Sequence, residues 1–115
     1  MSQKKSELLS VVLSSSLATA KILLPNGMEI QFAGNSRIIG RGDLARALDL
    51  DELGLISKQH FKVKSGDEQF YIEDLGSVNG TMLNGENIGG KGLVNLNHED
   101  IIEPAGITCL KFYLL

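Results

Sequence analysis

Apolar and polar residues alternate over short stretches of this chain, and turn-forming residues separate one stretch from the next. Residues 18–24 run into Pro25-Asn26-Gly27, and residues 28–32 then carry apolar side chains at alternate positions. Asn-Gly supplies the positive φ values that a tight turn needs, so residues 18–32 predict a β-hairpin. By the same pattern, further strands are predicted at residues 36–39, 60–64, 69–74, 81–83, 86–88, 93–94, 100–102 and 108–114.

The fold class follows from the number and spacing of these stretches. About ten short strands with Gly and Asn turns between them, and no alternation of strands with helices, predict an all-β fold, an antiparallel β-sandwich. Thirteen of the 115 residues are glycine, a share of about 11% against the usual ~7%. This excess agrees with many short elements and many turns. Residues 42–56 interrupt the pattern of strands. Residues 44–48 predict one helical turn after Asp43, but acidic residues and Gly54 interrupt it, so we expect a long loop with a short helix.

Residues 1–16 are rich in serine and show no period, so they predict an N-terminal tail ahead of a domain at residues 17–115. Within the tail, residues 8–13 are apolar except for Ser10. This stretch is far shorter than the ~20 apolar residues of a transmembrane helix, and the serine breaks the apolar run that a signal peptide needs. We therefore expect a soluble chain that is not secreted. For residues 8–13 the sequence leaves three alternatives open: an added strand, a homodimer contact or disorder.

Charge and cysteine content limit the partners and the compartment. The net charge is −3 and the sequence has no block of Lys or Arg, which argues against a binder of duplex nucleic acid or of anionic membranes. An anionic ligand would therefore have to be held locally. The single cysteine, Cys109, excludes an internal disulfide and fits the reducing cytoplasm, where it is most simply a small core residue.

Three clusters of residues carry candidate chemistry: Gly40-Arg41, Ser57-Lys58-Gln59-His60 and Ser77-Val78-Asn79-Gly80-Thr81. The serine and histidine of the second cluster have the residue types of a nucleophile and its base, but acyl transfer also needs an oriented third group and an oxyanion hole. No Gly-x-Ser-x-Gly elbow surrounds Ser57, so we expect no enzymatic activity. His60 and His98 form no spaced ligand set, so the sequence predicts no metal and no other cofactor.

In this order and spacing, and with the trailing Asn84-Gly85, the three clusters resemble the signature of the forkhead-associated (FHA) domain. The resemblance covers about residues 18–115. It implies a sandwich of about eleven short strands whose loops, at one end, bind phosphothreonine peptides. The implied function is that of a non-enzymatic adaptor in Ser/Thr kinase signalling, with a threonine-phosphorylated protein or peptide as its partner.

The resemblance also implies roles for individual residues. Arg41 would be the main phosphate contact, Ser57 a hydroxyl donor to the phosphate, and Lys58 a second cation or backbone donor. Asn79 would hydrogen-bond the peptide main chain beside the phosphothreonine. Two or three charge-assisted hydrogen bonds of roughly 1.5–3 kcal/mol each can support micromolar binding without a basic surface.

The remaining matches are implied to shape the site: Gly40, His60, Ser77, Gly80 and Thr81. Among them, His60 is implied to tie the recognition loops together by hydrogen bonds. Val78 departs from the family pattern, in which this position is often polar; its side chain can line the apolar niche for the phosphothreonine methyl group, or simply pack. The alternative to a phosphate-binding module is a phosphate-independent interaction or oligomerisation module on the same sandwich, because resemblance to a family does not prove function.

Overall fold

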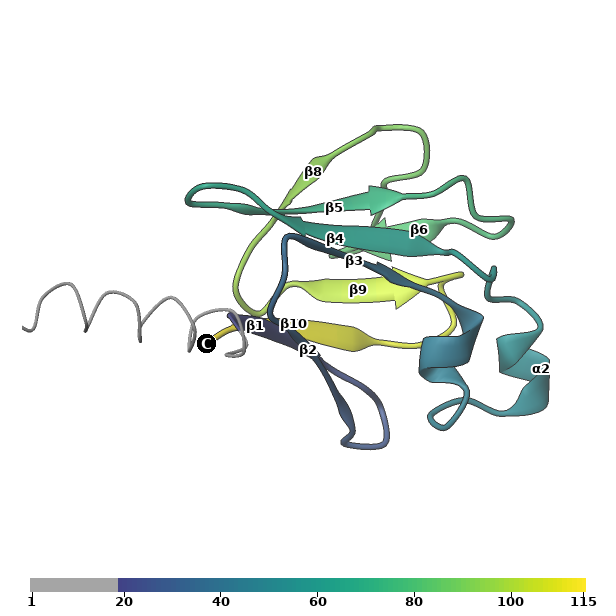
Figure 1. The fold of residues 1–115 in the computed structure, drawn as a ribbon. Coiled ribbons are helices and arrows are strands. Elements are labelled where there is room, and N and C mark those ends of the chain that lie inside the picture. The colour runs from purple at the N-terminus through teal and green to yellow at the C-terminus, as the bar shows by residue number, and fades with distance from the viewer. Residues whose placement is uncertain (1–18) are drawn as a thin grey trace, which may run out of the picture.

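The computed structural model describes residues 19–115, which form two stacked antiparallel β-sheets (Figure 1). The ten strands are β1 (Ala20–Leu23), β2 (Glu29–Phe32), β3 (Ser36–Ile39), β4 (Phe61–Ser65), β5 (Phe70–Asp74), β6 (Thr81–Leu83), β7 (Glu86–Asn87), β8 (Val94–Leu96), β9 (Ile101–Pro104) and β10 (Leu110–Leu114). The larger sheet has the order β2-β1-β10-β9-β6-β7, and the smaller sheet has the order β3-β4-β5-β8. The predicted antiparallel sandwich is confirmed, with ten strands in place of about eleven. The predicted tail and the alternatives for residues 8–13 lie outside the described residues.

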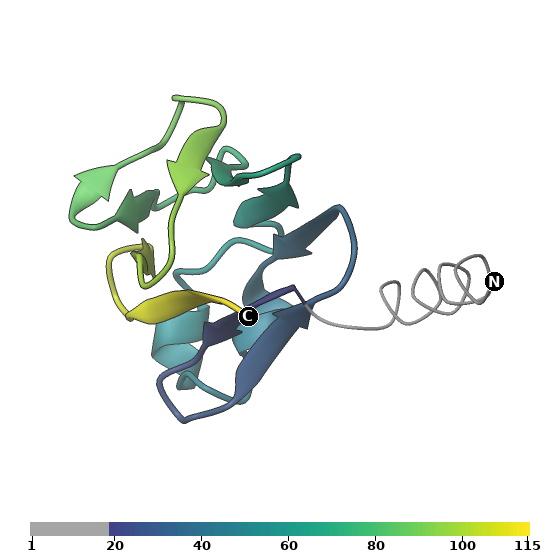
Figure 2. The ribbon, with the colours of Figure 1, turned by 90° about the vertical axis from the view of Figure 1, so that its left-hand side faces the viewer.

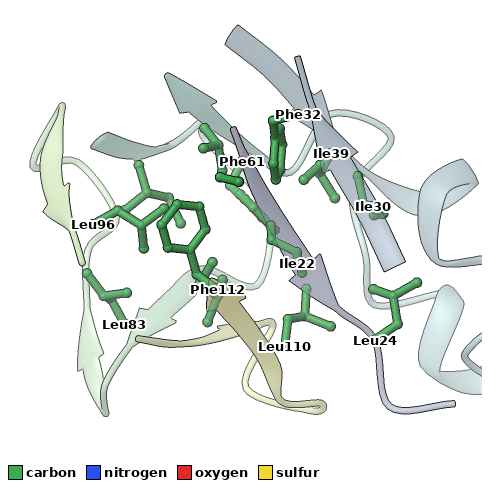
Figure 3. Packing of buried hydrophobic residues seen from close by; sticks show 14 of the residues in the cluster. Ile22, Leu24, Ile30, Phe32, Ile39, Phe61, Leu83, Leu96, Leu110 and Phe112 are labelled. Carbon is green, nitrogen blue, oxygen red and sulfur yellow. The ribbon is translucent and has the colours of Figure 1, made fainter. Parts of the chain in front are cut away.

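The core lies between the two sheets and is built from the inward-facing positions of the alternating strands (Figure 3). β1 buries Ile22 and β10 buries Phe112 from the larger sheet, while β4 buries Phe61 from the smaller one. The rings of Phe70 and Phe112 join the two sheets, with 5.3 Å between their centroids. Each side chain of this size contributes about 1.5–3 kcal/mol by its burial, so this core supports the sandwich without a disulfide.

The last strand corrects one expectation. β10 begins at Leu110, and its buried positions are Leu110 and Phe112. Cys109 precedes the strand and is exposed, and its Sγ donates to Glu103 Oε2 at 3.5 Å. The prediction that Cys109 is a core residue is therefore wrong, because successive residues of a strand point to opposite faces and the buried face here starts one residue later.

The two predicted Asn-Gly turns are present, with different backbone conformations. Asn84 and Gly85 both have positive φ values, 50° and 86°, as a two-residue turn between β6 and β7 requires. In the β1–β2 turn only Gly27 has a positive φ, 88°, and the Asn26 side chain instead accepts from the N–H of Met28 at 3.0 Å. Asparagine thus tolerates the positive φ in one turn and supplies a side-chain hydrogen bond in the other.

The segment between β3 and β4 contains two short helices, the 3-10 helix η1 (Arg41–Leu44) and the α-helix α2 (Leu50–Leu53). Asp49 caps α2, because its Oδ1 accepts from the N–H of Glu52 at 2.8 Å while Glu52 Oε1 accepts from the N–H of Asp49 at 3.1 Å. In place of the single helical turn predicted at residues 44–48, one helix ends at Leu44 and the other begins at Leu50. Within residues 19–115 no helix is long and apolar enough to cross a membrane.

Three connections meet at one end of the sandwich: residues 40–60 between β3 and β4, residues 75–80 between β5 and β6, and residues 105–109 between β9 and β10 (Figure 1). The C-terminus lies at the opposite end, which faces the viewer in Figure 2. The packed sheets therefore present these three connections together on one side of the molecule.

Candidate functional site

The three residue clusters singled out in the sequence meet at this end of the sandwich. The backbone N–H of Arg41 donates to the carbonyl of Ser57 at 3.1 Å, which joins the first cluster to the second. The backbone N–H of Val78 donates to Ser57 Oγ at 3.1 Å, and His60 Nε2 lies 2.7 Å from the carbonyl oxygen of Gly80. These two contacts join the second cluster to the third, so segments far apart in the sequence form one site.

Gly40 lies where the first two clusters touch. A Cβ atom at this position would lie 1.8 Å from the carbonyl oxygen and 2.5 Å from the carbonyl carbon of Lys58. Both are backbone atoms, so no rotation of a side chain relieves the overlap. The position therefore requires glycine because two backbone segments approach each other closely.

His60 is fully buried and joins two of the connections. Its Nδ1 accepts from the N–H of Ser57 at 3.1 Å, which assigns the ring proton to Nε2, the donor to the carbonyl of Gly80 at 2.7 Å. Its backbone N–H donates to the carbonyl of Ile39 at 2.9 Å, and its carbonyl accepts from the N–H of Leu75 at 3.0 Å. The side chain and backbone of His60 thus tie the two connections to each other and to β3.

Arg41 and Ser57 present hydrogen-bond donors at the surface. Because Ser57 Oγ accepts the N–H of Val78, its hydroxyl hydrogen remains available to a ligand. Arg41 is exposed, and its Nε donates to the carbonyl of Ile56 at 3.0 Å, which fixes the orientation of the guanidinium. The two terminal amino groups of Arg41 have no hydrogen-bond partner among residues 19–115. An anion at this place can therefore accept from both side chains.

Asn79, Lys58 and Val78 lie at the exposed rim of the site. Asn79 Nδ2 donates to the carbonyl of Leu55 at 2.9 Å, which orients the carboxamide so that Oδ1 can accept from a ligand. Lys58 adds a cation next to Ser57. Val78 is 87% exposed, so the alternative that its side chain simply packs against the rest of the domain is wrong.

Asp74, at the end of β5, is a residue of this site that the sequence analysis missed. Its carboxylate accepts four hydrogen bonds: two from the backbone N–H groups of Gly76 and Ser77 at 3.1 Å, and two from the hydroxyls of Ser77 and Thr81 at 2.6 Å. Burial alone would raise the pKa of Asp74, but the hydrogen bonds from Ser77 and Thr81 outweigh it, and the pKa is lowered. Ser77 and Thr81 therefore shape the 75–80 connection through Asp74. Asp followed by a serine three positions later is the signal that could have found this turn.

Asp43 is the second residue that the sequence analysis missed. Its Oδ2 accepts from the N–H of Gly40 at 2.9 Å, and its Oδ1 accepts from Nη2 of Arg37 at 2.9 Å. The backbone N–H of Asp43 in turn donates to the carbonyl of Gly40 at 3.0 Å. These contacts hold the start of η1, and thus the backbone of Arg41, in place. The signal in the sequence is an acidic residue three positions after Gly40, the glycine of the first cluster.

A groove of about 560 Å³ borders the 75–80 connection. Its lining is mostly glycine and carboxamide, including Gly76, Asn79, Gly80, Asn87 and Gly89. Such a surface offers hydrogen bonds to a peptide main chain more readily than a pocket for a large side chain. Among residues 19–115 no group of three or more His, Cys, Asp or Glu side chains is placed to hold a metal ion.

Comparison with protein families assigns this arrangement. The model of the FHA domain matches residues 37–103, more than half of the chain and all three clusters. The chain belongs to the FHA domain family. This membership confirms the resemblance identified from the sequence, and it accounts for the order in which the clusters of this FHA domain occur.

Individual relatives agree with this membership. An FHA domain-containing protein of Arabidopsis thaliana is 33% identical over 77 residues, which are 67% of this chain and 20% of that protein. This chain thus spans about a fifth of the length of that curated relative. The MEK1 FHA domain, solved in complex with a phosphothreonine peptide of HOP1, is 30% identical, with a TM-score of 0.65 and coverage of 85% of this chain and 98% of that one. The FHA domain of the CT664 protein from Chlamydia trachomatis is 29% identical, with a TM-score of 0.62 and coverage of 84% and 95%.

Proposed function

We propose that this FHA domain binds threonine-phosphorylated proteins or peptides as a non-enzymatic adaptor. The observation that carries the proposal is the convergence of the Arg41 guanidinium and the Ser57 hydroxyl, each held by another protein group and each with donors left for a ligand. A phosphate group, with close to two negative charges and three acceptor oxygens, fits these donors. The MEK1 FHA domain, 30% identical to this chain, is in complex with a phosphothreonine peptide.

The proposal gives a separate role to each of four residues of the site. Arg41 donates paired hydrogen bonds to the phosphate, the Ser57 hydroxyl donates a further one, and Lys58 adds a second positive charge. Asn79 Oδ1 accepts from a peptide N–H beside the phosphothreonine, because its Nδ2 is already held by Leu55. Local donors of this kind reconcile a net charge of −3 with an anionic ligand.

The geometry of Ser57 and His60 supports the absence of catalysis by this pair. The His60 nitrogen that faces Ser57 accepts the backbone N–H of that residue, and the other ring nitrogen donates to the carbonyl of Gly80. Neither nitrogen is therefore left to take a proton from Ser57 Oγ, which a nucleophile and its base would require. The pair ties the loops together instead.

We also propose that phosphothreonine is preferred over phosphoserine. Val78 offers an exposed apolar surface beside Ser57, where the threonine methyl group can lie against it. Burial of one methyl group contributes on the order of 1 kcal/mol. The stiffer χ1 of a β-branched residue adds to this preference, because less side-chain freedom is lost on binding.

Titration of the full chain with a library of phosphothreonine peptides, beside the same library without phosphate, tests the proposal. We expect about micromolar binding of the phosphorylated library alone. Arg41→Ala should abolish this binding without changing the unfolding curve, because the side chain is exposed. Arg46→Ala, which removes an exposed arginine of the same connection, is the matched control and should bind within about twofold of the unmodified chain. Equal binding of the two libraries would contradict the proposal in favour of a phosphate-independent interaction module.

A further inference from the structure

β3 lies at the edge of the smaller sheet, with β4 on one side and no strand on the other within residues 19–115 (Figure 1). The chain turns at Gly40 into η1 and α2, so it does not return along β3. Ser36, Arg37 and Ile38 are all exposed, and Ile38 is 44% exposed although it is a large apolar residue. An open edge with an exposed apolar side chain is a surface on which another strand can form.

The direction of the β3 backbone groups follows from its pairing with β4. The N–H of Ser65 donates to the carbonyl of Asn35 at 2.8 Å, and the N–H of His60 donates to the carbonyl of Ile39 at 2.9 Å. Odd-numbered residues of this segment therefore direct their backbone groups toward β4. Because these groups alternate in direction along an antiparallel strand, the N–H and C=O groups of Ser36 and Ile38 point to the open edge.

We propose that a segment of the same partner chain that carries the phosphothreonine pairs with the open edge of β3 as an added strand. This inference rests on the proposed function of the site. The edge is continuous with that site, because β3 ends at Ile39 and the phosphate-binding Arg41 follows two residues later. Four strand residues span about 13 Å, so a partner bound at Arg41 needs only a short further stretch to cover the whole edge.

The side chains around the edge indicate the chemistry of that segment. Ile38 pairs with Lys62 and Ser36 pairs with Lys64 in the register of β3 with β4. Lys62 is already neutralised by Glu73, with 3.6 Å between Nζ and Oε1, whereas Lys64 has no acidic partner among residues 19–115. We therefore expect a β-branched or aromatic residue beside Ile38 and an acidic residue near Ser36 and Lys64.

A second copy of this chain fits the edge less well than a partner segment. Arg37 is already paired with Asp43, and Lys62 with Glu73. β3 itself contains no acidic residue, so a second copy of β3 brings no free carboxylate to Lys64. An acidic segment of a partner supplies the opposite charge that Lys64 lacks. The phosphorylated partner is therefore the occupant that the charges favour.

The test uses the full chain and peptides of about 20 residues with a fixed central phosphothreonine and randomised flanks. Selected peptides are then shortened to a core of about seven residues around the phosphothreonine. We expect the long peptide to bind about tenfold more tightly than its core. Ile38→Pro should reduce the affinity for the long peptide to that for the core, and should leave the affinity for the core unchanged. The N–H that proline removes points outward, so the pairing of β3 with β4 is retained.

Ile38→Val is the matched control, because it keeps the backbone N–H and the branched side chain, and it should retain the full advantage of the long peptide. Ser36→Pro, at the first residue of β3, provides a second variant if Ile38→Pro lowers the melting temperature. Hydrogen exchange at the amides of Ser36 and Ile38 should slow with the long peptide and stay fast with the core. These two amides report strand addition directly, since they have no partner within the sheet.

Several results would overturn the inference. Equal affinity for the long peptide and the core, or an advantage that Ile38→Pro does not remove, would exclude pairing with β3 while leaving phosphothreonine binding intact. A dimer in sedimentation experiments that Ile38→Pro dissociates would assign the edge to a second copy. Failure of both long and core peptides to bind the unmodified chain would contradict the proposed function itself, and with it this inference.

Discussion

The connection at residues 40–60 depends on a close approach of two backbone segments, in addition to the hydrogen bonds of Asp43, whereas the connection at residues 75–80 is organised around the single carboxylate of Asp74. In the first, Gly40 lies so close to Lys58 that no Cβ atom fits between them. In the second, Asp74 accepts four hydrogen bonds from Gly76, Ser77 and Thr81. The candidate site lies between the two, and His60 joins them.

The two connections should therefore lose their structure in response to different changes. Close packing is disrupted when volume is added, and it does not depend on pH. A carboxylate that accepts hydrogen bonds fails when its charge is removed, either by substitution or by acid. The buried histidine should affect both connections, because it contacts both.

The largest effect is expected from Gly40→Ala. The new methyl group would overlap the backbone of Lys58, so the segment that carries Ser57 must move. We expect a loss of about 3 kcal/mol in the free energy of unfolding and no measurable phosphopeptide binding. Chemical denaturation and calorimetric titration measure both. Gly42→Ala is the matched control, since a Cβ at Gly42 meets nothing within 4 Å, and equal behaviour of the two variants would contradict the packing argument.

The next largest effect is expected from His60→Ala. It removes a fully buried ring and leaves the N–H of Ser57 and the carbonyl of Gly80 without their partners. We expect about 2–3 kcal/mol of destabilisation together with weaker phosphopeptide binding, because both connections lose their common tie. Thermal unfolding and titration of the same samples test this. A normal melting temperature in His60→Ala would contradict the tying role, and His98→Ala, at the exposed histidine, serves as the control.

Asp74→Asn should have an intermediate effect that is confined to the second connection. The carboxamide cannot accept as many hydrogen bonds as the carboxylate, so the hydroxyls of Ser77 and Thr81 lose a charged acceptor. We expect about 2 kcal/mol of destabilisation at neutral pH and several-fold weaker binding. Asp67→Asn removes an exposed carboxylate in the β4–β5 turn and is the control. If both variants unfold at the same denaturant concentration, Asp74 does not hold the 75–80 connection.

Acid should remove the same contribution in the unmodified chain. The pKa of Asp74 is lower in the fold than its ordinary value, so its contribution is fully present above the ordinary value of about 3.9 and is lost as the pH falls through the lowered pKa. Below about pH 4, the unmodified chain should therefore lose stability more steeply than Asp74→Asn. Denaturation curves at a series of pH values, taken for both chains, measure the difference. Parallel pH dependence of the two chains would contradict the assignment of this contribution to Asp74.

The same comparison explains what could be predicted from the sequence. Alternation and turn residues are local signals, so the β1–β2 hairpin and the sandwich could be predicted from the sequence. The contact between Gly40 and Lys58 is not local, because it exists only once β3 and β4 have paired. The role of Asp74 could not be predicted, because an acidic residue at the end of a strand is usually solvated. Its four hydrogen-bond donors come together only when the following turn closes.

The smallest effect is expected from Val78→Ala, and it separates the side chain of this residue from its backbone. The Val78 side chain is 87% exposed, so its truncation should change the free energy of unfolding by less than about 0.5 kcal/mol. Its backbone N–H keeps the hydrogen bond to Ser57 Oγ, so Ser57, one of the proposed phosphate donors, stays in place. If Val78 contacts the threonine methyl group, the preference for phosphothreonine over phosphoserine should fall by about threefold, as loss of part of a methyl contact implies. Paired titrations with two peptides that differ only in this methyl group measure the ratio. An equal loss of affinity for both peptides would show that Val78 acts on the phosphate donors and leaves the methyl group uncontacted.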